Sequence, residues 1–128
     1  MHEGDLAACA ELCRGVHGID RTIELRAAMA QFSPLVLVRS GRVRAYASAP
    51  HMWLMNHGVA ETEQDLRALL LGAAAAGAPP VSLLVPVRQG ALFRWCLGAG
   101  LRVIKPMTLM SLGRYQEPRG CFYPSVLY

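Results

Sequence analysis

The chain has 128 residues, of which 53% are hydrophobic and 17% charged, and its net charge is +4. This length fits one domain with one core, and the composition excludes a disordered chain. The arginines are scattered instead of forming a basic stripe with interleaved aromatic residues, so we expect no nucleic-acid partner.

The four cysteines, at positions 9, 13, 96 and 121, form no C-x-x-C pair, and no histidine lies at zinc-finger spacing. We therefore expect no metal site and no disulfide framework. The longest apolar stretch is too short to span a membrane, and the first residues do not resemble a signal peptide. These features predict a cytoplasmic protein with no membrane partner.

Residues 1–32 are predicted to be helical. Asp5 is placed to cap a helix whose apolar positions run from Leu6 to Val16, and Gly18 ends it. A second helix is expected over residues 21–30, before the Ser33-Pro34 pair.

Residues 33–60 are predicted to be antiparallel strands. A buried strand over 35–38 and an alternating strand over 42–49 flank the turn Ser40-Gly41, which is typical of a hairpin. A third strand is expected over 53–59.

Residues 61–112 are predicted to alternate helix, strand, helix and strand. Thr62 and Asp65 resemble a capping box at the start of the first helix, which Gly77 closes. The apolar run 81–87 predicts a buried strand, and residues 89–99 predict the second helix.

The last predicted strand of this region covers residues 101–111 and is interrupted by Pro106. The tail, residues 113–128, is expected to end in a short strand, SVLY. Residues 1–128 thus predict one domain of mixed α+β (α/β) class, with a central mixed sheet flanked by helices.

Three segments, in this order, resemble the GNAT acetyltransferase superfamily. SGRVRAYAS (residues 40–48) is similar to the hairpin segment of that family. VAE (59–61), entering the helix that contains RALLLGA, resembles its fourth strand and third helix. PVSLLVPVRQGALFRWCLGAGLRV (80–103) resembles its closing strand–helix–strand unit.

The chain also resembles the C-terminal halves of two-module GNAT proteins, through LCRGVHGIDRTIELRAAM (12–29) and KPMTLMSLGRY (105–115). The resemblance implies the acyl-CoA N-acyltransferase fold and acetyl-CoA-dependent N-acetyl transfer to a small-molecule amine. Acetyl-CoA would lie beside the fourth strand, where the backbone of Gly58, Val59 and Ala60 would bind the cofactor and steady the oxyanion.

His57 or Glu61 would be the base of such a reaction, and Cys96 falls where the family often keeps a tyrosine as general acid. Each also has a structural interpretation. His57 fits a histidine bonded to backbone at a strand end, Glu61 fits a favourable charge at a helix start, and Cys96 fits a buried thiol.

The chain departs from the family at the loop that would cradle a pyrophosphate. No glycine lies between Gly58 and Gly72, and Glu61, Glu63 and Asp65 would repel a diphosphate. The alternative function is therefore a non-catalytic binding or interaction module that has lost this loop and supports a catalytic partner GNAT module. The partner could equally be a second copy of this chain, in a homodimer.

Overall fold

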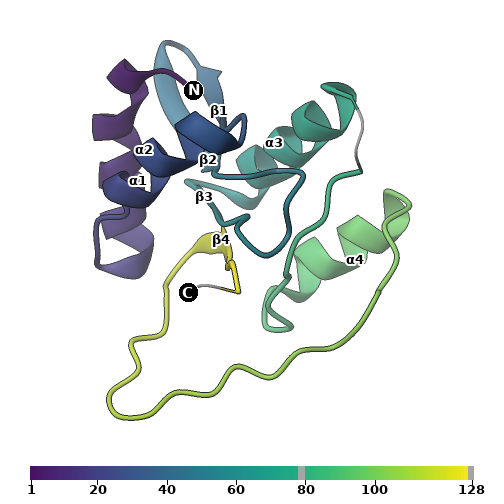
Figure 1. The fold of residues 1–128 in the computed structure, drawn as a ribbon. Coiled ribbons are helices and arrows are strands. Elements are labelled where there is room, and N and C mark those ends of the chain that lie inside the picture. Colours follow the sequence, from purple (N-terminus) through teal and green to yellow (C-terminus); the bar gives the residue numbers. More distant parts are fainter. Residues whose placement is uncertain (78–79, 127–128) are drawn as a thin grey trace.

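A four-stranded sheet lies between two pairs of helices in the computed structural model, which describes residues 1–77 and 80–126 (Figure 1). After a short 3-10 turn, Glu3–Asp5, the elements follow in chain order: α1 (Leu6–His17), α2 (Thr22–Gln31), β1 (Leu35–Arg39), β2 (Arg42–Ala47), β3 (Gly58–Ala60), α3 (Glu63–Ala75), α4 (Gly90–Gly98) and β4 (Cys121–Tyr123). The predicted α+β class is confirmed.

The sheet has the strand order β1-β2-β3-β4, and every neighbouring pair is antiparallel. The prediction of a mixed sheet is therefore wrong for the described residues. The physical reason lies at the edge of β3 that faces away from β2. This edge pairs with β4 from the C-terminal tail, so no strand from residues 81–87 pairs with it in parallel.

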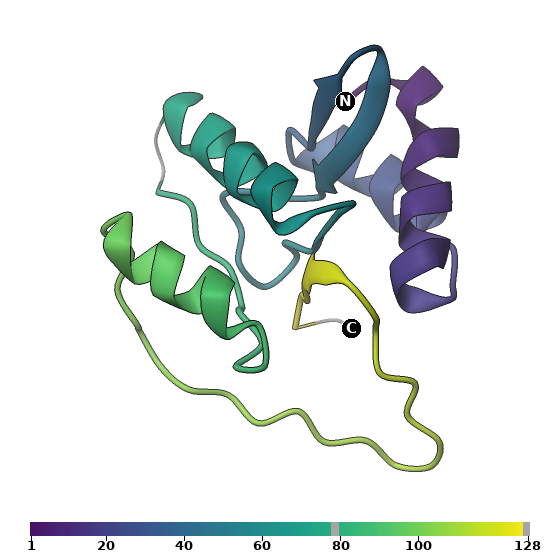
Figure 2. The same ribbon diagram turned by 180° about the vertical axis from the view of Figure 1, so that it is seen from behind.

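Two clusters of buried side chains hold the layers together, one on each face of the sheet. Figures 1 and 2 show α1 and α2 on one side of the sheet and α3 and α4 on the other. On the α1–α2 face the buried members are Leu6, Cys9, Cys13, Leu25, Tyr46, Val59 and Phe122. On the α3–α4 face they are Ala45, Ala47, Ala60, Leu66, Leu69, Leu70, Leu92, Cys96 and Tyr123. Consecutive residues of β2 alternate between the clusters because successive strand side chains point to opposite faces.

The hairpin of β1 and β2 is confirmed, and its turn explains why it forms. Ser40 and Gly41 both have positive φ, 51° and 73°. This matches the two-residue turn whose twist suits paired antiparallel strands. The first helix also ends as predicted, since Gly18 adopts φ 73° and its N–H donates to the carbonyl of Arg14. Asp5 accepts from the backbone N–H of His2 instead of capping α1.

The predicted strand over 53–59 shortens to β3. Its first half forms consecutive turns instead. The Ala49 carbonyl accepts a hydrogen bond from the N–H of Met52, and the Met52 carbonyl accepts from the N–H groups of Met55 and Asn56. The predicted strands over 81–87 and 101–111 are not strands in the described structure. The tail contributes β4 at Cys121–Tyr123. Of the strand predicted at the chain end, residues 125–126 are not in a strand and residues 127–128 lie outside the described residues.

None of the helices in the described part of the chain is both long enough and apolar enough to cross a membrane.

The start of α3 has the predicted cap, and it gives a first test of the structure. The Thr62 Oγ1 accepts from the backbone N–H of Asp65 at 3.1 Å, and it donates to the Asp65 carboxylate at 2.6 Å. We expect Thr62→Ala to lower the free energy of unfolding by about 1 kcal/mol in urea denaturation. Gln64→Ala, at an exposed position in the same first turn of α3, is the control and should be close to neutral. Equal effects of the two changes would contradict the cap.

Candidate functional site

The candidate site begins at β3, which holds the backbone groups expected to bind the cofactor. Gly58, Val59 and Ala60 are all buried. Val59 lies opposite Tyr46 of β2 on one side and opposite Phe122 of β4 on the other. Because the peptide groups of a central strand point alternately to its two neighbours, the N–H groups of β3 are directed into ladders. Neither edge of this strand is open to a thioester.

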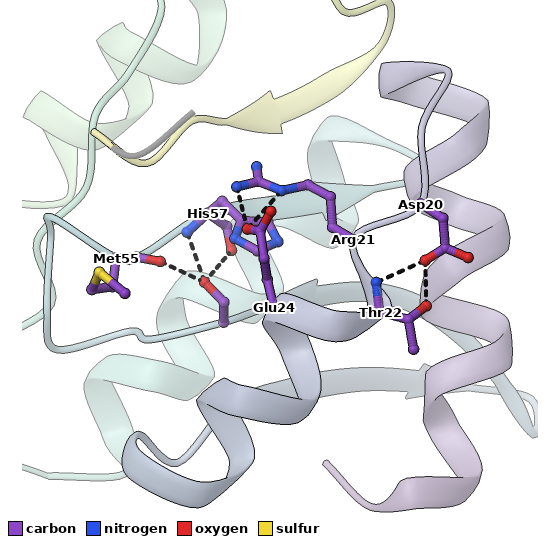
Figure 3. Close-up of polar contacts among 7 residues, drawn as sticks. Asp20, Arg21, Thr22, Glu24, Met55 and His57 are labelled. Carbon is purple, nitrogen blue, oxygen red and sulfur yellow. Dashed lines mark hydrogen bonds and ion pairs between the residues drawn. The ribbon is translucent and has the colours of Figure 1, made fainter.

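His57 immediately precedes β3 and is 1% exposed. Its backbone N–H donates to the Ser48 hydroxyl at 2.9 Å (Figure 3). Its carbonyl accepts from the backbone N–H of Ser48, also at 2.9 Å. Its ring packs edge-on against Tyr46 with 5.5 Å between the ring centroids. Among the described residues, Nε2 has no hydrogen-bond partner. The structural interpretation, a histidine bonded to backbone at a strand end, therefore matches these contacts.

The electrostatic surroundings of His57 keep it neutral. Burial lowers its pKa well below 6.5, and electrostatic interactions with Arg21 and His17 lower it further. The imidazole is therefore a poor proton acceptor, since protonation would place a second cation in a buried site near Arg21.

Arg21 and His17 were not among the predicted site residues, although the structure brings both towards His57. Arg21 is buried at the start of α2 and forms an ion pair with Glu24, as Figure 3 shows. The ring of His17 lies edge-on to Phe122 at 5.2 Å. Sequence spacing gives no signal for this cluster, because its three basic side chains come from α1, the start of α2 and the residue before β3.

A pocket of about 310 Å³ opens beside His57, between α2 and the segment before β3. Its lining includes Glu24, Phe32, Ser48, Met55, His57 and Ser125. Its walls are largely apolar, and its polar residues are Glu24, Gln31, Ser48, His57 and Ser125. The Nε2 of His57 is itself buried, so a ligand in the pocket does not reach this atom without movement of the wall.

Glu61 follows β3 directly, and its carboxylate is held by two arginines. It forms an ion pair with Arg44 and a second with Arg42 at 3.5 Å. Its backbone N–H also donates to the Arg44 carbonyl at 2.9 Å. These contacts direct the carboxylate towards β2 and occupy both of its oxygens, Oε1 with Arg42 and Oε2 with Arg44.

Cys96 lies on α4 within the core cluster of the α3–α4 face, whereas His57 packs towards α2 on the other face. The thiol is 4% exposed. Burial raises its pKa, with Glu63 adding to the effect and Arg67 opposing it. The structure therefore does not bring Cys96 and His57 to one site.

The junction between β3 and α3 contains only Glu61 and Thr62. At the N-terminus of α3, Glu63 pairs with Arg67, and Asp65 lies 3.3 Å from Arg39. The positive end of the helix dipole is thus already satisfied by carboxylates of this chain. No glycine-rich loop is present there to approach a pyrophosphate.

No protein-family model, no curated protein and no solved structure matches this chain. The structure itself defines the class: an α+β protein whose antiparallel sheet is covered by helices on both faces.

Proposed function

We propose that this chain is a GNAT-like binding module that supports a partner and does not transfer acetyl groups by itself. The observation that carries this proposal is the pairing of β3 on both edges. An acetyltransferase of this kind would need an open edge beside this strand for the arm of acetyl-CoA. Here β4 fills that position, and its residues Phe122 and Tyr123 are buried.

The N-terminus of α3 supports the same conclusion. Anion binding at a helix start needs backbone N–H groups that the ligand can approach. The two-residue junction leaves no loop for this, and the Thr62 hydroxyl occupies the N–H of Asp65. The carboxylates of Glu63 and Asp65 would oppose a diphosphate at this end of the helix.

The three predicted catalytic side chains are also separated by their contacts. His57 is neutral and buried, Glu61 is bound to two arginines, and Cys96 lies on the opposite face of the sheet. No position in the described structure therefore has a catalytic base close to a catalytic acid, or a catalytic base close to an oxyanion site. The features that resemble the family are therefore those of the scaffold, namely the hairpin, β3 and α3.

Calorimetric titration of the purified chain with acetyl-CoA tests this proposal. We expect no binding at millimolar ligand, while an active acetyltransferase in the same buffer serves as the positive control. Glu63→Gln is the matched variant. If a phosphate site existed, removing this charge would strengthen binding, whereas we expect neither protein to bind. Micromolar affinity for acetyl-CoA in either protein would overturn the proposal and restore the acetyltransferase interpretation.

A further inference from the structure

The pocket beside His57 owes its volume to small side chains on α2. Four of its lining residues lie three or four positions apart and so share one face of the helix: Glu24, Ala27, Ala28 and Gln31. Because the two central members are alanines, this face leaves a hollow of about 310 Å³ against the segment that carries Met55 and His57 (Figure 3). Pockets for small molecules span roughly 300–1,000 Å³, so this one suits a compact ligand.

The lining of the pocket carries no unbalanced charge. Glu24 is the only residue of the described lining with a formal charge at neutral pH, and its Oε2 accepts from both Nε and Nη2 of Arg21. This ion pair balances the one negative charge of the lining. His57 is neutral because burial lowers its pKa. A charged ligand would lose its hydration here without gaining a counter-charge, so the electrostatics favour an uncharged molecule.

One hydroxyl group in the pocket is available to a ligand. Ser125 is 4% exposed, and its Oγ has no hydrogen-bond partner among the described residues. The other hydroxyl is already used, because Ser48 Oγ donates to the Met55 carbonyl at 2.8 Å and accepts from the His57 N–H. A serine hydroxyl both donates and accepts, so a hydroxyl or N–H group on the ligand would satisfy it.

The apolar wall of the pocket includes Phe32, which follows α2, and Met55, which precedes β3. Aromatic rings pack favourably against a phenylalanine ring, edge to face or offset. The methionine thioether also makes favourable contacts with ring edges, and its three rotatable bonds let it adapt to the shape of a ligand. This wall therefore favours a flat aromatic molecule over a branched aliphatic one.

We propose that the pocket binds an uncharged aromatic molecule of one or two fused rings that carries a hydroxyl or N–H group. The ring packs on Phe32 and Met55, and the polar group bonds to Ser125 Oγ. His57 Nε2 stays buried behind the wall and takes no part in binding. This inference goes beyond the proposed function, because it gives the binding module a small-molecule ligand beside the segment that leads into β3.

Titration with three indole compounds of similar size tests the chemistry of the site. Tryptophol carries a hydroxyl group on its side arm, tryptamine an ammonium group and indole-3-acetate a carboxylate. The readout is the methyl signal of Met55 in carbon-proton NMR spectra of the methionine-labelled protein. We expect tryptophol to shift this signal with a Kd of about 1 mM or tighter, which is ordinary for a ligand of this size. The two charged compounds should bind at least about tenfold more weakly.

Variants of α2 and of the tail locate the binding. Ala28→Leu fills the pocket and should weaken tryptophol binding at least about tenfold. Ala27→Leu narrows the pocket from an exposed position, so it serves if the buried change impairs folding, which circular dichroism checks. Ala30→Leu, exposed on the same helix and outside the described lining, is the matched control and should bind like the native protein. Ser125→Ala should weaken binding about fivefold because it removes the available hydroxyl.

An unchanged Met55 signal at about 10 mM tryptophol would overturn this inference. So would tryptamine or indole-3-acetate that binds as tightly as tryptophol, or binding that the changes at Ala27 and Ala28 leave intact. The signals of Met107 and Met110, which lie outside the described lining, are an internal control. Shifts there as large as that of Met55 would contradict binding in the pocket. None of these outcomes alters the acetyl-CoA titration, so failure of this inference is distinguishable from failure of the proposed function.

Discussion

Acidification from pH 7 to pH 4 is expected to destabilise the fold by about 3 kcal/mol or more through two buried histidines. Burial lowers the pKa of His17 from 6.5 to about 4, with the charge of Arg21 adding to the effect. The pKa of His57 lies well below 6.5 for the same leading reason. In the unfolded chain both side chains bind a proton near pH 6.5, whereas in the folded protein both stay neutral.

The sign follows from which state binds more protons. Between pH 6.5 and about 4 the unfolded state holds the additional proton of His17, so stability falls as the pH falls through this window. His57 contributes in the same direction, and its window also starts at 6.5. Each proton contributes a slope of up to about 1.4 kcal/mol per pH unit.

Urea denaturation at a series of pH values measures this dependence. We expect His57→Gln to reduce the slope between pH 6.5 and pH 4 because it removes one of the two groups. His2→Gln changes an exposed histidine and should leave the slope as it is in the native protein. A free energy of unfolding that stays constant over this window would show that the two imidazoles are not held neutral in the fold.

Gly58→Ala is expected to destabilise the protein by about 1–3 kcal/mol, towards the upper end of that range. A Cβ at this position would lie closer than 3.0 Å to the Cζ, Cε1 and Oη atoms of Tyr123. Tyr123 is fully buried on β4, directly opposite Gly58, and its hydroxyl donates to the Asn56 side-chain oxygen at 3.2 Å. The aromatic ring has no space into which it can retreat without breaking this contact.

Gly72→Ala is the matched control for this change. Gly72 lies on the exposed side of α3, and a Cβ there would have no atom within 4 Å. Because alanine is a better helix former than glycine, this change should stabilise the protein by about 0.5–1 kcal/mol. Thermal or urea denaturation compares the two variants. Equal tolerance of both substitutions would mean that β4 does not pack against β3 as the structure shows.

The Gly58–Tyr123 contact also explains why the candidate site differs from the sequence-based hypothesis. The resemblance to GNAT proteins implies an opening beside residues 58–60. The glycine instead lets a tyrosine ring from the tail lie directly against the strand. Sequence spacing could not show this, because Gly58 and Tyr123 are far apart in the chain and the tail has no alternating pattern that specifies its strand partner.

Local features of the fold follow from the sequence. Gly18, the Ser40-Gly41 turn and the Thr62 cap set the end of α1, the hairpin and the start of α3 through backbone conformation and neighbouring hydrogen bonds alone. The two-residue junction before α3 and its acidic character are likewise visible in the residue order.

Only the tertiary structure decided which segments of the chain pair as strands. Residues 81–87 and 101–111 have strand composition, but a strand exists only when its backbone groups pair, and the tail takes the edge of β3 instead. Likewise, only packing places Arg21 and His17 close enough to His57 to lower its pKa. Contacts between distant segments determine both results, so neither local propensity nor residue spacing contains them.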